Sequence, residues 1–172
     1  MDIKFLFPTE LEAAPFRTLC PDAAVEICGV GMAQTAACVA RLLGEGHRKF
    51  ILAGIAGAYS EELAKGNVVA VCEERVAGIP TQFDKSYSAN LKIGGLREVQ
   101  SNTVCRCGAE ANGAEIENME GATLFALCEA FGAECAEVRA ISNYVGEARE
   151  GWDIPLALEN LTHELRLILG RK

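Results

Sequence analysis

The chain of 172 residues carries a formal net charge of −8, from 24 acidic and 16 basic residues, and half of its residues are hydrophobic. This length suits one well-buried core, so we expect a single domain over residues 1–172, and the apolar content excludes a disordered chain. The acidic balance argues against a nucleic-acid partner, because binding a phosphate backbone needs clustered cations.

The first half of the chain alternates short apolar runs with helical patterns. Four apolar runs predict buried strands, at residues 3–7, 25–30, 50–56 and 68–71. Thr9 follows the first run and can cap a helix whose first turn is acidic. The alanine-rich run at 32–43 predicts a second helix, which Gly44 and Gly46 end.

The second half begins with its least regular part. Residues 73–102 include Pro80 and a pair of adjacent glycines, which predict loop and irregular strand. Asn118 can cap a helix that Gly132 closes. Strands are predicted at 103–107 and 137–142, and helices at 119–131 and 154–169.

Alternating strands and helices indicate an α/β protein. The strand candidates are nearly continuous apolar runs, which is typical of a sheet covered on both faces, so we expect a three-layer α/β/α sandwich. In such folds the functional residues gather where the carboxyl ends of strands meet.

The chain shows no sign of a membrane or an oxidising compartment. Its longest apolar runs, such as residues 50–59, are far shorter than the roughly 20 residues that a membrane span needs. No signal-peptide pattern precedes the first strand, so we expect a cytoplasmic protein that does not bind a membrane. The eight cysteines are then expected to be reduced core residues.

Two glycine-bearing turns follow predicted strands. The backbone at Gly31, and at Ile55, Ala56 and Gly57, is a candidate for close approach to a polar group of a ligand, with simple tight turns as the alternative. The first turn lacks the third glycine of a dinucleotide fingerprint. We therefore expect no nucleotide cofactor there.

Metal ligands are also poorly represented. Cys105 and Cys107 are two residues apart, but no second cysteine pair lies at zinc-site spacing, and His47 and His163 stand alone. We expect no metal site and no cofactor of any kind.

Three polar side chains follow strand ends and stand out together. Glu12 follows the first strand, Glu120 begins a largely apolar helix, and Asn143 ends the strand at 137–142. Taken alone, each residue has a purely structural explanation: a first-turn acid complements the helix dipole, and an asparagine can end a strand in a turn. Their combination favours a binding site.

These pieces resemble the nucleoside phosphorylase and nucleosidase superfamily, and within it most closely the futalosine hydrolases. The matching segments are Phe7-Pro-Thr-Glu-Leu-Glu12, Gly29-Val-Gly31, Ala53-Gly-Ile-Ala-Gly57, Gly66-Asn-Val-Val69, Glu117-Asn-Met-Glu-Gly-Ala122, Arg139-Ala-Ile-Ser-Asn-Tyr-Val145 and Trp152-Asp-Ile-Pro-Leu-Ala157. The resemblance implies a sandwich with a mixed central sheet, a purine nucleoside as the small-molecule substrate, and a homo-oligomer.

The resemblance also implies a role for each polar residue. Glu12 would position or deprotonate the attacking water, Met119 and Glu120 would hold the ribose, and Asn143 would meet the base. N-glycoside cleavage passes through an oxocarbenium-like sugar, so a carboxylate near the ring and a partner for the departing base both lower the barrier.

Two positions bear on the substrate. Nucleosidases that act on adenine usually carry Asp where this chain has Asn143, and an amide can donate to a 6-oxo oxygen and accept from a protonated N7, so hypoxanthine fits better. Ile55 stands where several relatives have a polar residue, which disfavours a phosphate site. The implied reaction is hydrolysis of futalosine to hypoxanthine, as in menaquinone biosynthesis.

Alternatives remain at this stage. The same residue pattern fits a methylthioadenosine or adenosylhomocysteine nucleosidase and a purine nucleoside phosphorylase. It also fits a nucleoside-binding protein without catalytic activity. Futalosine carries a carboxylated aromatic group at the 5′ position, for which Arg149 is a candidate. The aromatic residue that often stacks on the base is missing, leaving Phe83, Tyr87 or a partner subunit as candidates.

Overall fold

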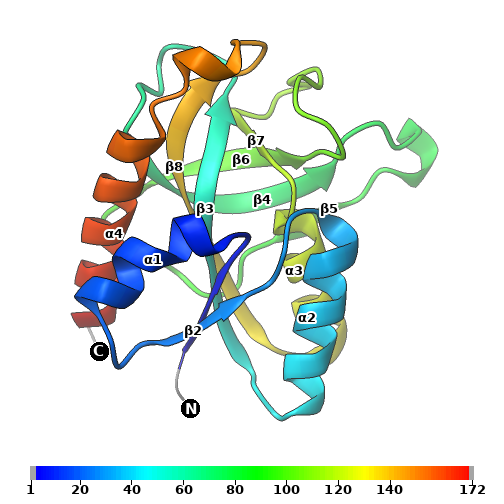
Figure 1. The fold of residues 1–172 in the computed structure, drawn as a ribbon. Coiled ribbons are helices and arrows are strands. Elements are labelled where there is room, and N and C mark those ends of the chain that lie inside the picture. Colours follow the sequence, from blue (N-terminus) through cyan, green and yellow to red (C-terminus); the bar gives the residue numbers. More distant parts are fainter. Residues whose placement is uncertain (1–2, 171–172) are drawn as a thin grey trace.

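The computed structural model describes residues 3–170 and has an eight-stranded mixed sheet with helices on both faces (Figure 1). The strands are β1 (Lys4–Phe7), β2 (Ala24–Ile27), β3 (Lys49–Ala58), β4 (Val68–Val76), β5 (Ser86–Ser88), β6 (Arg97–Thr103), β7 (Ile116–Asn118) and β8 (Glu134–Tyr144). The helices are α1 (Glu10–Leu19), α2 (Met32–Gly44), α3 (Gly121–Phe131) and α4 (Ile154–Gly170), with 3₁₀ turns η1 (Thr81–Phe83) and η2 (Arg149–Gly151). The predicted α/β/α sandwich is confirmed.

The sheet has a parallel half and a half that closes on itself. Strands β2, β1, β3 and β8 are parallel neighbours, so their carboxyl ends share one edge. Beyond them, β8 pairs antiparallel with β4, β4 pairs with β6, β6 with β7, and β7 returns to β3. In Figure 1, β4 and β6 run across the direction of β3 and β8, which shows how far the sheet bends.

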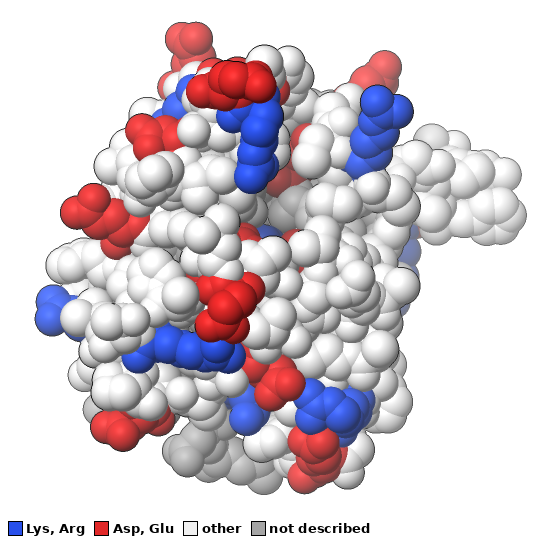
Figure 2. Space-filling model, viewed as in Figure 1, with Lys and Arg blue, Asp and Glu red and all other residues white. Residues whose placement is uncertain are grey.

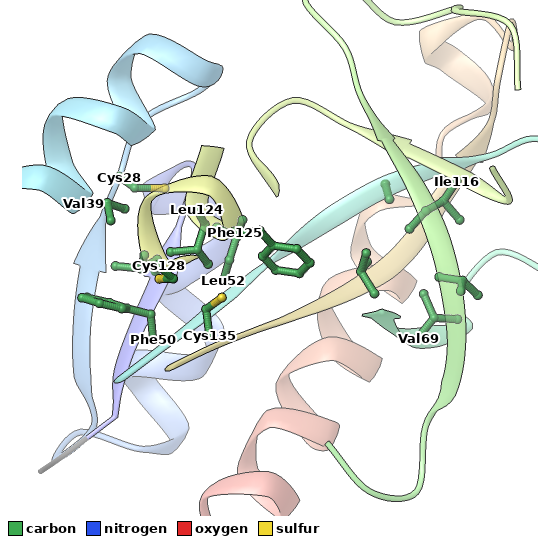
Figure 3. Packing of buried hydrophobic residues seen from close by; sticks show 14 of the residues in the cluster. Cys28, Val39, Phe50, Leu52, Val69, Ile116, Leu124, Phe125, Cys128 and Cys135 are labelled. Atoms are coloured by element: carbon green, nitrogen blue, oxygen red, sulfur yellow. The ribbon is translucent and has the colours of Figure 1, made fainter. Parts of the chain in front are cut away.

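Each face of the sheet has its own core. Helices α1 and α4 cover one face, where Phe5 and Phe7 pack against Phe16 with ring centroids 4.9 and 5.9 Å apart. Helices α2 and α3 cover the other face, over an apolar cluster that includes Phe50 and Phe125 (Figure 3). Burial of both faces explains why the strands are nearly continuous apolar runs.

The middle segment is more regular than the sequence indicates. Strand β4 continues to Val76, and the segment predicted as irregular holds β5 and most of β6. The strand predicted at 103–107 is wrong, because β6 ends at Thr103 and the chain then bends. Register against β4 and β7 decides where this strand ends, and a local pattern does not carry that information.

The cysteines are all free, but they are not all core residues. Cys28, Cys128 and Cys135 are buried, whereas Cys105 and Cys107 are exposed, which corrects the expectation for that pair. They lie in the bend after β6 rather than on a strand. Over residues 3–170, no helix is long and apolar enough to cross a membrane.

Candidate active site

A cavity of about 300 Å³ lies at the edge where the parallel strands end. Figure 2 shows a hollow on this side of the molecule, with charged atoms of both signs at its bottom. The sequence-predicted residues that line the cavity are Glu12, Ile55, Ala56, Gly57, Met119, Glu120 and Asn143. Gly31 adjoins it through a hydrogen bond to Glu120. The structure therefore brings the predicted residues together.

Glu12 is placed by the start of α1. Thr9 caps the helix, accepting from the Glu12 N–H at 3.3 Å, and its hydroxyl donates to Glu12 Oε2 at 2.6 Å. Glu12 Oε1 accepts from the backbone N–H of Ile55 at 3.0 Å. Glu12 is 6% exposed, and two neutral donors hold its carboxylate at the wall of the cavity.

Glu120 is placed by the junction of β7 and α3. Asn118 Oδ1 accepts from the backbone N–H groups of Glu120 and Gly121 at 2.8 Å each. The helix begins at Gly121 with Glu120 at the N-cap position, so Asn118 supports the helix start but is not the N-cap residue that the sequence predicted. Glu120 Oε1 accepts from the Gly31 N–H at 2.9 Å. The N–H groups of Gly31 and Ile55 thus hold carboxylates of the protein, where the sequence had suggested contact with a ligand.

Arg139 forms ion pairs with Glu120 and Glu137, and it was not among the residues predicted from the sequence. This residue of β8 is 1% exposed, and its Nη2 donates to Glu120 Oε2 at 3.1 Å and to Asn118 Oδ1 at 2.9 Å. Its Nε donates to Glu137 Oε1 at 2.6 Å. Burial lowers the pKa of the guanidinium, but the carboxylates of Glu137, Glu120 and Glu12 outweigh it and raise that pKa above its usual value.

Asn143 reaches the cavity because β8 has a bulge. Ala56 pairs with Ile141 and Gly57 with Asn143, so Ser142 is the extra residue, and both Ser142 and Asn143 line the cavity. The Ser142 hydroxyl donates to Asn143 Oδ1 at 2.8 Å, and Asn143 Nδ2 donates to the Tyr144 carbonyl at 3.1 Å. An amide has two N–H donors and two acceptor lone pairs, so one of each remains for a ligand.

Glu117 also lines the cavity and was not expected. Its carboxylate accepts from the backbone N–H groups of Gly108 and Ala109, at 2.8 and 3.2 Å, and from the Tyr59 hydroxyl at 3.1 Å. The pKa of Tyr59 is raised to about 12, mainly by burial and to a smaller extent by the Glu117 charge. Glu117 therefore fastens the loop after β6 over one side of the cavity.

The outer wall carries a cation and an aromatic ring. Arg149 and Trp152 both line the cavity, and the guanidinium carbon lies 4.2 Å from the centre of the indole ring. Over residues 3–170, Arg149 forms no ion pair. Phe83 is 71% exposed and Tyr87 packs against the core, so neither expected stacking residue reaches the cavity.

The arrangement combines a carboxylate held by neutral donors, a carboxylate paired with a buried guanidinium, and an amide across the cavity. It can activate a water, accept hydrogen bonds from hydroxyl groups, and offer a donor and an acceptor to a heterocycle. Among residues 3–170, no three His, Cys, Asp or Glu side chains lie together as metal ligands.

Comparisons with known proteins find similar sequences and a similar fold. The model of the phosphorylase superfamily matches residues 96–168. Futalosine hydrolase from Thermus thermophilus is 32% identical over 98 residues, which are 55% of this chain and 44% of that protein. The alignment thus spans less than half of the length of this curated relative.

Solved structures extend the likeness to the whole chain. A futalosine hydrolase mutant of Helicobacter pylori has a TM-score of 0.87 at 15% identity and is covered completely, as is this chain. A 5′-methylthioadenosine/S-adenosylhomocysteine nucleosidase from the same organism has a TM-score of 0.86 at 14% identity, over 100% of this chain and 99% of that one. The resemblance expected from the sequence is confirmed, and this chain has the fold that these nucleosidases share.

Proposed function

We propose that this chain hydrolyses the N-glycosidic bond of a purine nucleoside, with water as the nucleophile and no cofactor. One observation carries the proposal: Glu12, Glu120 and Asn143, far apart in the sequence, line one cavity about 300 Å³ in volume. That size lies at the small end of ligand sites and suits a nucleoside. The superfamily match and the futalosine hydrolase relative support the same reaction.

Each residue has a role in this proposal. Glu12 positions and deprotonates the water, Met119 packs against the ribose, and Glu120 accepts hydrogen bonds from the ribose hydroxyls. Asn143 donates to the 6-oxo oxygen of the base and accepts from N7 as the base departs. Ile55 and Gly57 support the wall around the reacting bond.

Futalosine is the substrate that we favour. The free donor and acceptor of Asn143 complement hypoxanthine, because a mismatched exocyclic group leaves a buried polar group unpaired at a cost of about 1–3 kcal/mol. Arg149 and Trp152 stand at the outer wall, where a carboxylate and an aromatic ring at the 5′ end would find a cation and a stacking surface.

The discriminating experiment is a base-release assay with futalosine, inosine and methylthioadenosine, each with and without phosphate. Release of hypoxanthine from futalosine, independent of phosphate, is the expected result. Preferential release of adenine from methylthioadenosine would favour the second candidate, a methylthioadenosine nucleosidase, whose fold matches equally well. Binding of inosine without any release of base would contradict an enzymatic role.

Arg149→Gln tests the 5′ end directly. Loss of the cation should raise KM for futalosine by about tenfold, as expected for one charge-assisted contact, and leave KM for inosine unchanged. Arg106→Gln, on the loop after β6, is a matched control at an exposed arginine. Equal effects on both substrates would contradict this assignment.

The remaining parts of the proposal concern the whole protein. We propose a cytoplasmic enzyme of menaquinone biosynthesis that folds as one domain and acts as a homo-oligomer. Large exposed side chains support the last point: Leu11 is 62% exposed and Phe131 is 57% exposed.

A further inference from the structure

Two glutamates with no role in the proposed reaction are buried together near the cavity. Glu74 lies on β4 and is 0% exposed, and Glu137 lies on β8 and is 1% exposed. Both face Gly121, the first residue of α3. A Cβ atom placed there would lie 2.3 Å from Glu74 Oε1 and 2.3 Å from Glu137 Oε2, so the two carboxyl groups meet at this glycine.

The hydrogen bonds of the pair are unequal. Glu137 Oε1 accepts from Arg139 Nε, but Glu137 Oε2 has no hydrogen-bond partner within the described residues. Glu74 accepts from the Thr103 hydroxyl at 2.7 Å and from the Asn118 amide, both neutral groups. A buried acceptor without a donor is costly, and a proton on the Glu74 carboxyl would supply the missing donor.

The balance of buried charges also favours a proton on the Glu74 carboxyl group. Three buried carboxyl groups, those of Glu12, Glu120 and Glu137, act on Arg139, the one buried guanidinium over residues 3–170, and the carboxyl group of Glu74 meets that of Glu137. Two adjacent carboxyl groups in a buried site do not both ionise. Burial, and after it the Glu137 charge, raises the pKa of Glu74 well above its usual value. Burial also raises the pKa of Glu137, but the Arg139 charge opposes this rise.

We propose that Glu74 is protonated at neutral pH and donates to Glu137 Oε2, and that this pair positions Arg139 against Glu120. Glu74 and Glu137 are then positioning residues for the ribose-binding carboxylate, an inference that rests on the proposed function. Ionised Glu137 holds Arg139 Nε, which leaves Nη2 for Glu120. Ionisation of Glu74 would add a second anion that draws the guanidinium away from Glu120.

The surroundings of Glu74 contain few other titratable groups. Strand β8 presents Glu137 and Arg139, and β5 presents Tyr87, the register partner of Glu74. The N-cap of α3 presents Glu120, and the residue after β3 presents the Tyr59 hydroxyl. Uncharged groups fill the rest, from Ser101 and Thr103 of β6 and Asn118 of β7. Arg139 is thus the only cation in this set, and it is shared.

Glu74→Gln and Glu137→Gln separate the two halves of the pair. An amide at position 74 mimics a protonated acid, so we expect a smaller loss of kcat/KM for inosine or futalosine than at position 137, where the loss should be at least about tenfold. Glu73→Gln, the neighbouring and partly exposed acid, is the control that should match wild type. Equal losses at 74 and 137 would overturn the assignment of the proton.

The pH profile gives a result that a purely structural role would not produce. Wild-type kcat/KM should fall on the alkaline side as Glu74 loses its proton, and Glu74→Gln should lack this fall because glutamine does not titrate. A raised pKa in the folded state stabilises the protein at acid pH, and this stabilisation is lost as pH rises. The melting temperature of wild type should therefore drop relative to Glu74→Gln as pH rises above about 4.5. An unchanged alkaline fall in the variant would refute the proposal.

Infrared spectroscopy of wild type decides the same point without a variant. A protonated carboxyl C=O band should persist at neutral pH and disappear at alkaline pH; its absence at neutral pH would contradict the inference. If wild type releases no base from any nucleoside, the proposed function fails by itself. The melting and infrared results would still decide whether Glu74 carries the proton.

Discussion

Glu12 and Glu120 line the same cavity but are held by different partners. Neutral donors, the Thr9 hydroxyl and the Ile55 N–H, hold Glu12, whereas Glu120 shares a hydrogen-bonded ion pair with Arg139. The ion pair with Arg139 fixes the position of the Glu120 carboxylate, which suits it to accept hydrogen bonds from hydroxyl groups of a ligand. Glu12 is the better candidate to accept a proton from water.

Glu12→Gln tests this division of roles. The amide fills the same space but cannot accept the proton, so kcat should fall by about 10²-fold or more while KM changes little. The matched control is Glu10→Gln, an exposed residue of the same helical turn that pairs with Arg17. Steady-state release of hypoxanthine measures both, and full activity in Glu12→Gln would reject the general-base role.

Asn143→Asp tests the recognition of the base. A carboxyl group at this position can protonate N7 and accept from a 6-amino group, which an amide that donates to a 6-oxo group cannot do equally well. We expect the ratio of kcat/KM for adenine nucleosides to that for inosine to rise by about tenfold or more. Competition between inosine and adenosine in one assay measures it; an unchanged ratio would contradict the amide argument.

Arg139 shows why part of the site escapes sequence reasoning. Glu12, Glu120 and Asn143 lie where predicted elements begin or end, and a local pattern there indicates exposure to a crevice. Arg139 lies inside a strand, and its contacts with Asn118 and Glu120 depend on how β7 and α3 meet β8. The sequence did contain one indication, because a charged residue within an apolar strand must find a partner. The same indication applies to Glu137.

At the scale of elements, the end of β3 forms one wall of the cavity. Ile55, Ala56 and Gly57 line the cavity, and Gly54 lies directly between two charged side chains. A Cβ atom at Gly54 would lie 2.7 Å from Arg139 Nη1 and 2.8 Å from Glu12 Oε1. The absence of a side chain there lets the guanidinium and the carboxylate approach each other.

Gly54→Ala should therefore damage the site more than the fold. The methyl group must push Glu12 or Arg139 aside, and overpacking of this kind typically costs about 1–3 kcal/mol. We expect a fall in kcat/KM of about 10²-fold, since small displacements of catalytic groups have effects of this size, with a moderate fall in melting temperature. Gly44→Ala, where the added atom meets nothing within 4 Å, is the control. Wild-type turnover in Gly54→Ala would show that the close approach is dispensable.

The bounds of some helices and strands were predicted from the sequence more accurately than those of others. Helices α2 and α4 were found within a residue of their ends, because a long apolar stripe and glycine boundaries are local features. Residues 73–102, which hold β5 and most of β6, were predicted to form loop and irregular strand, because Ser86–Ser88 and Arg97–Thr103 carry many polar residues and become regular strands by pairing with β4. Tertiary pairing overrides local propensity there.

At the scale of the whole molecule, two loops from distant parts of the chain complete the cavity. The loop after β6 contributes Val104 and Cys107, and the loop around η2 contributes Arg149 and Trp152. Both are largely exposed, and contacts such as that of Glu117 with Gly108 fasten them to the strands. Segments of this kind open locally at low free energy, so a ligand that bridges them should close both.

Hydrogen exchange measured by mass spectrometry tests this coupling. Saturation of the Glu12→Gln variant with futalosine should slow amide exchange at residues 104–110 and 146–153, because the bound ligand stabilises the closed form of each loop. Residues 77–85 are also exposed but lie outside the cavity lining, so their exchange should not change and they serve as an internal control. Slowing of all three segments would indicate a general stabilisation, and slowing of none would show that the loops do not form the outer wall of the binding site.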